Sequence, residues 1–146
     1  MSGRIFPTSQ DAENAFYEAL EHADLEGMMA VWSEDEEIVC VHPGGPRLCG
    51  QDQVRESWAQ IFAGGGRTRV HITQQVSISG MMLAVHSVFE RFTIPQAAAE
   101  AQPAPIVATN VYLRTPAGWR MIVHHASPAP AQPQPAPPDT GPKILH

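Results

Sequence analysis

Hydrophobic and polar residues alternate along most of the second half of the chain, which is the pattern of half-buried β-strands. The clearest case is residues 106–115 followed by residues 119–127, two alternating runs separated by Pro116-Ala117-Gly118. Residues 70–78 alternate in the same way, and Gly80 separates them from another run at residues 82–94. These patterns predict two long antiparallel hairpins.

The first half of the chain has helical spacing of its hydrophobic residues instead. Behind the capping residue Thr8, apolar side chains recur at intervals of three and four, which indicates one buried helical stripe. Asp24 is a good N-cap for a second short helix, and a third helix from about Asp52 buries Trp58.

Two short strands are predicted between the second and third helices, at residues 38–42 and 47–50, around a Pro-Gly-Gly-Pro turn. The order of elements therefore predicts an α+β fold, with three N-terminal helices packed on an antiparallel sheet. We expect one domain over residues 1–127. The Pro- and Ala-rich residues 128–146 form a tail that is either solvated or docks Ile144 and Leu145 on the body or a partner subunit.

The amino-acid composition argues against some classes of binding partner. The 146 residues carry nine basic and fifteen acidic side chains, a net charge of −6, which argues against a nucleic-acid partner. No apolar run approaches the ~20 residues of a membrane span. The first residues do not resemble a signal peptide, so we expect a cytoplasmic protein in which Cys40 and Cys49 remain thiols.

Three segments resemble a known family: residues 15–20, residues 24–32 and residues 118–123. They are similar to the SnoaL-like branch of the nuclear-transport-factor-2-like superfamily, which includes ketosteroid isomerases, polyketide cyclases and the calmodulin-kinase association domain. The resemblance implies a cone-shaped fold, in which a curved sheet wraps around the helices. It also implies an apolar pocket at the open end and a homodimer made sheet to sheet. It implies no particular activity, because enzymes and binding modules share the fold.

Ketosteroid isomerases of this fold use a tyrosine and a protonated aspartate as oxyanion donors, with an Asp-Pro pair supplying the base. By counting along the resemblance, these positions fall on Phe16, on Asn110 and on His42-Pro43. Phe16 has no hydroxyl group. Because the loss of one oxyanion donor typically costs about 10²–10³ in rate, the steroid reaction is disfavoured.

A different site is predicted from the last hairpin. Pairing Thr115 with Trp119 sets Asn110 opposite His124 and Tyr112 beside Ile122. We therefore expect His42 and His124 as candidate acid–base residues. The expected ligand-binding residues are Phe16, Trp58, Asn110 and Tyr112. The alternative is that both histidines have only a structural role. A shift of one residue in the pairing of the two strands would place His125 in the site instead of His124.

No histidine pair has the spacing of a zinc site, and no glycine-rich loop opens a helix, so neither a metal nor another cofactor is expected. Glu90 is expected at an exposed strand edge, paired with Arg91 or with a cross-strand partner, in preference to a buried general base. Two observations favour a protein that only binds a small apolar molecule: Phe16 has no hydroxyl group, and we expect no strand carboxylate near Asn110. The alternatives are an isomerase, dehydratase or cyclase that uses a pocket histidine, and a scaffold that recruits another protein.

Overall fold

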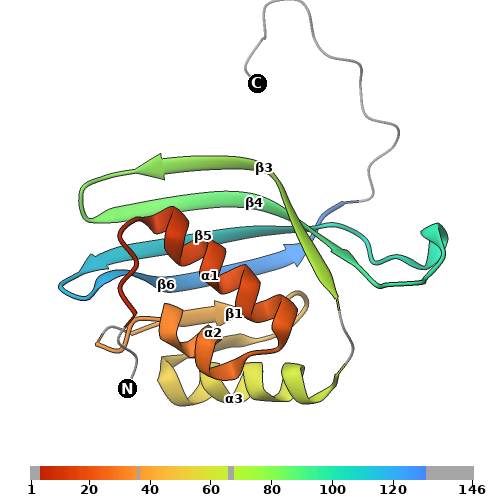
Figure 1. Ribbon diagram of the computed structural model, residues 1–146, viewed down its shortest axis with the longest axis horizontal. Helices are drawn as coiled ribbons and strands as arrows, with labels where there is room; N and C mark the ends of the chain where they lie inside the picture. Colours follow the sequence, from red (N-terminus) through yellow and green to blue (C-terminus); the bar gives the residue numbers. More distant parts are fainter. Residues whose placement is uncertain (1–3, 36, 66–67, 131–146) are drawn as a thin grey trace, which may run out of the picture.

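The computed structural model describes residues 4–35, 37–65 and 68–130. Over these residues three α-helices pack against one face of a six-stranded sheet (Figure 1). The helices are α1 (Ser9–His22), α2 (Leu25–Val31) and α3 (Gly50–Ala63), with a short 3₁₀ turn, η1 (Ala99–Ala101). The strands are β1 (Val39–Val41), β2 (Arg47–Cys49), β3 (Arg69–Ser79), β4 (Leu83–Thr93), β5 (Ile106–Thr115) and β6 (Gly118–Pro128).

The strand order in the sheet is β2-β1-β6-β5-β4-β3. Neighbouring strands are antiparallel, except that β1 runs parallel to β6 and so joins the small β1–β2 hairpin to the long hairpins. The predicted α+β class, the three helices and both long hairpins are confirmed. The sheet was expected to be antiparallel but is mixed, because β1 pairs in parallel with β6. Residues 131–146, and with them Ile144, Leu145 and most of the predicted tail, lie outside the described residues.

The helices α1 and α2 begin where the sequence provides capping residues. The Thr8 hydroxyl accepts a hydrogen bond from the Asp11 amide, and the Asp24 carboxylate accepts one from the Gly27 amide. The hydrophobic face of α1 is buried against the sheet, with Ala12 and Phe16 fully inaccessible to solvent. This places α1 across β5 and β6, the strands that hold the candidate site.

The pairing of β5 with β6 differs from the predicted register near the turn. Thr115 lies opposite Gly118, and Tyr112 lies opposite Met121 and not opposite Ile122. A β-bulge between Val111 and Tyr112 then inserts one residue into β6, which restores the predicted pairing of Asn110 with His124. The bulge also turns Met121 into the core, where it is fully buried, although strict alternation from Val123 would place it on the outer face.

The outer face of the sheet, away from the helices, carries a row of apolar side chains. The row follows the strand pairing across five strands and consists of Val39, Val123, Val111, Val85 and Ile78. Toward the β3–β4 end the large side chains are open to solvent, with Ile78 67% exposed. We call these five residues the outer row.

No helix within residues 4–35, 37–65 and 68–130 has the length and apolar character needed to cross a membrane.

Candidate functional site

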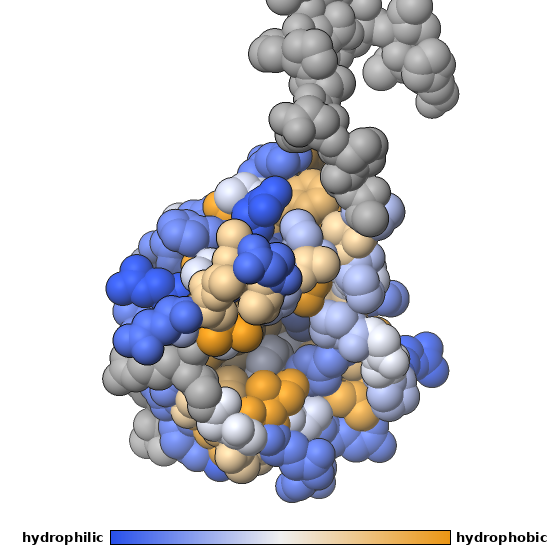
Figure 2. Space-filling model, turned by 90° about the vertical axis from the view of Figure 1, so that its right-hand side faces the viewer, coloured by the Kyte–Doolittle hydropathy of each residue, from blue (hydrophilic) through white to orange (hydrophobic). Residues whose placement is uncertain are grey.

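A cavity of about 280 Å³ opens between α3, the end of α1 and the sheet. Figure 2, which views the right-hand side of Figure 1, shows a hollow there with hydrophobic residues around it. Its large apolar lining residues are Leu20, Trp58, Ile61, Phe62, Phe92 and Ile106, and the side chains of His42, Thr68, Glu90 and His124 supply its polar groups. The cavity is therefore mostly apolar, with a few polar atoms, as small-molecule sites usually are.

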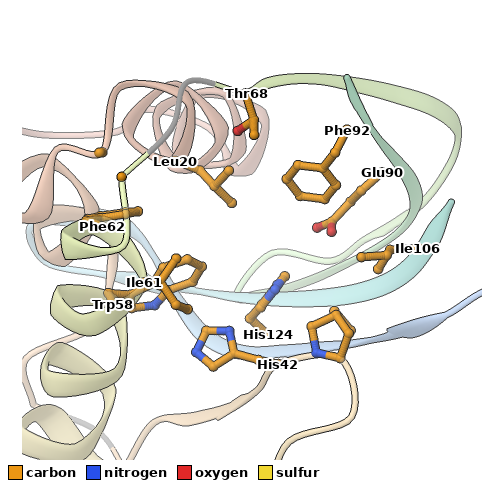
Figure 3. A pocket seen from close by; sticks show the side chains of 14 residues that line it. Leu20, His42, Trp58, Ile61, Phe62, Thr68, Glu90, Phe92, Ile106 and His124 are labelled. Atoms are coloured by element: carbon orange, nitrogen blue, oxygen red, sulfur yellow. The ribbon is translucent and has the colours of Figure 1, made fainter. Parts of the chain in front are cut away.

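The predicted site residues fall into two groups. His42, Trp58 and His124 line the cavity, and Figure 3 shows the two imidazole rings close to each other below Glu90. The His42 ring packs edge-on against Trp58, with ring centres 4.7 Å apart.

Phe16, Asn110 and Tyr112 do not line the cavity, because each is fully buried behind it. Phe16 packs instead against a residue of the lining, since its ring centre lies 4.9 Å from that of His124.

The polar residues behind the cavity form one buried hydrogen-bond network. The Tyr17 hydroxyl donates to Glu90 at 2.5 Å, and Asn110 Nδ2 donates both to the Tyr17 oxygen and to Glu13, each at 3.0 Å. Asn110 Oδ1 lies 2.6 Å from His124 Nδ1. The network therefore connects α1, β4, β5 and β6 and holds Glu90 and His124 in place at the cavity wall.

A second carboxylate, Glu13, anchors this network and was not predicted. It accepts a hydrogen bond from the Tyr112 hydroxyl at 3.0 Å, and its other oxygen lies 3.1 Å from Nδ1 of the buried His86. Glu13 and Tyr17 are four residues apart on α1, each one position after a residue of the buried stripe. That spacing is the sequence signal that both side chains share the edge of the buried face.

The prediction for Glu90 was wrong. The residue is 2% exposed, bonds to Tyr17 and lines the cavity, so it does not lie at an exposed edge. Glu90 is also a strand carboxylate near Asn110, because both residues bond to the Tyr17 hydroxyl group. The expected lack of such a carboxylate was one reason for preferring a protein without catalytic activity, and that reason is removed. Glu90 lies on the same face of β4 as the buried residues His86 and Val88, and the Tyr17 hydrogen bond satisfies its carboxylate there.

The hydroxyl that counting sought at Phe16 is present one residue later, at Tyr17. Its oxygen lies 3.0 Å from Asn110 Nδ2, but its hydrogen is directed to Glu90 and not to the cavity. Tyr17 also does not line the cavity. The hydroxyl group needed for steroid isomerisation therefore exists, but it is not a free oxyanion donor.

Burial shifts the protonation of the polar lining residues. It raises the pKa of Glu90 from 4.5 to about 7, with the nearby Glu13 carboxylate adding to the rise and the Tyr17 hydrogen bond opposing it. Burial lowers the pKa of His124 to about 3, helped by His42 and His125, and burial also lowers the pKa of His42. Near neutral pH the cavity thus holds two uncharged imidazoles beside a carboxyl group that is close to its midpoint.

These observations define the class of protein. It is a small α+β protein whose helices and sheet surround a mostly apolar cavity with a few converging polar groups. Residues 10–132 match the family model described as the SnoaL-like domain, so the chain belongs to the SnoaL-like family. The SnoaL-like and nuclear-transport-factor-2-like resemblance predicted from the sequence is thereby confirmed.

Two solved structures are similar to this chain in both sequence and fold. A protein from Thiobacillus denitrificans, assigned as a calcium/calmodulin-dependent protein kinase type II association domain, is 40% identical with a TM-score of 0.80, over 87% of this chain and 99% of that one. A protein from Streptomyces avermitilis, assigned as a dehydratase of the NTF2-like family, is 32% identical with a TM-score of 0.75, over 84% of this chain and 94% of that one.

Among curated proteins, the F-box protein SKIP8 of Arabidopsis thaliana is 23% identical over 114 residues. The match covers 77% of this chain but 46% of SKIP8, so the chain spans about half the length of that relative.

Proposed function

We propose that this protein binds a small, mostly apolar molecule in the cavity between α3 and the sheet. The observation that carries the proposal is the lining: large aliphatic and aromatic side chains surround three titratable groups, His42, Glu90 and His124. Apolar walls supply affinity through the area they bury, and a few fixed polar atoms orient the ligand.

The test is native mass spectrometry of the protein purified without detergent. We expect a co-purified small molecule on the wild type and its loss from Ala126→Phe, which fills the cavity from β6. Ala117→Phe is the matched control, because Ala117 lies exposed in the β5–β6 turn and away from the cavity lining. If Ala126→Phe does not fold, Ile106→Trp replaces it. A ligand retained by a folded, cavity-filled variant would contradict the proposal.

A second candidate function, proton-transfer catalysis of the dehydratase or isomerase type, is favoured by Glu90. A carboxyl group with a pKa of about 7 can donate or accept a proton near neutral pH, which is what general acid–base catalysis needs. The neutral imidazoles of His42 and His124 would serve as proton acceptors beside it. The similarity to the assigned dehydratase from Streptomyces avermitilis supports the same class of reaction.

A substitution series tests the catalytic candidate once a turned-over substrate is found. His42→Ala should reduce kcat/KM by about 10²-fold or more, whereas His125→Ala, on the exposed side of β6, should change it little. If Glu90 acts as the acid, the rate should also fall as pH rises through about 7. Equal losses from the two histidine variants would contradict the role of His42.

We further propose a cytoplasmic homodimer, joined through the outer face of the sheet. Support comes from the outer row, because an apolar sheet face of this extent is normally covered. A symmetric sheet-to-sheet contact would cover the row of both copies at once. The two cysteines, which are free thiols in the structure, fit a reducing compartment.

A further inference from the structure

The hydrogen-bond partners of His124 determine which of its ring nitrogens carries the proton. The network starts at Glu13, whose carboxylate accepts from Asn110 Nδ2. The other Nδ2 hydrogen goes to the Tyr17 oxygen, because Tyr17 gives its own hydrogen to Glu90. Asn110 Oδ1 therefore has only lone pairs to offer, and His124 Nδ1, 2.6 Å away, must donate to it.

His42 is held from the other side of the cavity, by α3. Ser57 has one hydroxyl hydrogen, which it donates to the carbonyl oxygen of Val54 at 2.8 Å. The 3.1 Å contact between Ser57 Oγ and His42 Nε2 is then a hydrogen bond in which Nε2 donates. The other nitrogen, Nδ1, keeps its lone pair, and Figure 3 shows it turned toward His124 and the cavity.

Both imidazoles thus offer acceptors to the cavity: Nδ1 of His42 and Nε2 of His124. No hydrogen bond within the described part of the chain uses either atom. Burial lowers the pKa of both rings, so neither gains the second proton that would turn these nitrogens into donors. The described lining contains no lysine or arginine, and the oxygen of Glu90 that accepts from Tyr17 is already engaged.

We infer that the ligand of this cavity is an uncharged, mostly apolar molecule bearing a hydroxyl group, which donates its hydrogen to His42 Nδ1 or His124 Nε2. The inference rests on the proposed binding function and specifies the chemical class that the site selects. A ketone oxygen would leave both imidazole acceptors unpaired, which weakens binding. The neutral donors of the described lining are the Thr68 hydroxyl and the indole N–H of Trp58, and that N–H is buried without a hydrogen-bond partner. A carboxylate would meet the imidazole lone pairs and Glu90.

An ammonium group fits less well than a hydroxyl group. It would lose its hydration in a mostly apolar cavity, and Glu90 is the one acidic residue of the described lining. A hydroxyl group needs only one acceptor and no counter-charge, and either imidazole provides it.

Four probes with the same bicyclic skeleton test this inference: 2-indanol, 2-indanone, 2-aminoindane and indane. Binding is measured by calorimetry at pH 8, where Glu90 is mostly ionised and accepts hydrogen bonds but does not donate them. We expect 2-indanol to bind about tenfold more tightly than each of the others, the effect of one well-made hydrogen bond. Ala126→Phe should abolish binding, and Ala117→Phe should leave it unchanged.

A second measurement reads the ring protons directly, through the nitrogen-15 NMR shifts of the imidazoles. We expect His124 protonated at Nδ1 and His42 at Nε2. Ser57→Ala removes the oxygen acceptor of His42 Nε2 and leaves it only the Cys40 sulfur, 3.7 Å away, which is a weak acceptor. The substitution should therefore mix the two forms of that ring and reduce the preference for 2-indanol several-fold.

The outcomes separate the two proposals. If 2-indanone or 2-aminoindane binds as tightly as 2-indanol, the hydroxyl inference is overturned and the proposed binding function stands. If no probe binds and no ligand co-purifies, the binding function fails, and the inference fails with it. Imidazole shifts that place the proton on His124 Nε2 or His42 Nδ1 overturn the inference whatever the probes do.

Discussion

Replacing the cavity carboxylate by glutamine isolates the free energy of burying its charge. Burial raises the pKa of Glu90 from 4.5 to about 7. The unfolded chain therefore loses the Glu90 proton at a lower pH than the folded protein does. As a result, the free energy of unfolding falls as pH rises from about 4.5 to about 7. At 1.36 kcal/mol for each pKa unit, the loss of stability is about 3 kcal/mol once the pH is well above 7.

Glutamine keeps the shape of the side chain and can still accept the Tyr17 hydrogen bond. We therefore expect the free energy of unfolding of Glu90→Gln, relative to the wild type, to rise by about 3 kcal/mol between pH 4.5 and pH 8. Urea denaturation of both proteins across this range measures the difference.

The comparison needs both proteins because His124 acts in the opposite direction. Its folded pKa of about 3 lies below the unfolded value, so the stability linked to it is complete above pH 6.5 and is lost as pH falls toward 3. In the wild type the stability change linked to His124 partly masks the change linked to Glu90. Because both proteins contain His124, its contribution cancels in the difference between their free energies of unfolding. A difference that stays constant from pH 4.5 to pH 8 would refute a desolvated Glu90.

Four further predictions concern the rest of the fold. Val111→Glu, which places a charge in the middle of the outer row, should give monomers or aggregates by sedimentation velocity, and a wild type that is itself monomeric at micromolar concentration removes the dimer proposal. A maleimide should label the exposed Cys49 in the native protein but Cys40 only after unfolding, because burial raises the pKa of the Cys40 thiol to about 12. Gly118→Ala should lower the free energy of unfolding by about 2–4 kcal/mol, since φ is +96° and the new Cβ would lie 2.8 Å from the Phe6 backbone. Gly44→Ala, with positive φ but open space around it, should cost about 1 kcal/mol in the same denaturation assay.

The order of elements could be predicted from the sequence because periodicity and capping residues are local signals. The register of the last hairpin was only half predictable. Counting from a three-residue turn gave the correct partner for Asn110, but the structure reaches that pairing through a tighter turn and a β-bulge. A bulge leaves no local signal here, because the residue it inserts, Ile122, is as apolar as its neighbours.

The site was predictable to the extent that its residues follow a face of a strand. His42, Trp58 and His124 lie at the cavity together, whereas the burial of Glu90 was not foreseen. A carboxylate inside a strand usually indicates exposure, and only a tertiary partner, Tyr17 on a helix far away in the sequence, makes its burial tolerable. Neither the sequence around Tyr17 nor the sequence around Glu90 shows by itself that these two side chains form a hydrogen bond.

The network behind the cavity has a consequence for engineering and for comparison among relatives. Asn110 and Ser57 do not line the cavity, yet each lies within hydrogen-bond distance of one imidazole nitrogen and so favours the tautomer in which the other nitrogen is the acceptor. A mutational library restricted to the lining would leave these determinants untouched. Two family members with identical linings but different residues at position 110 should therefore select different ligands.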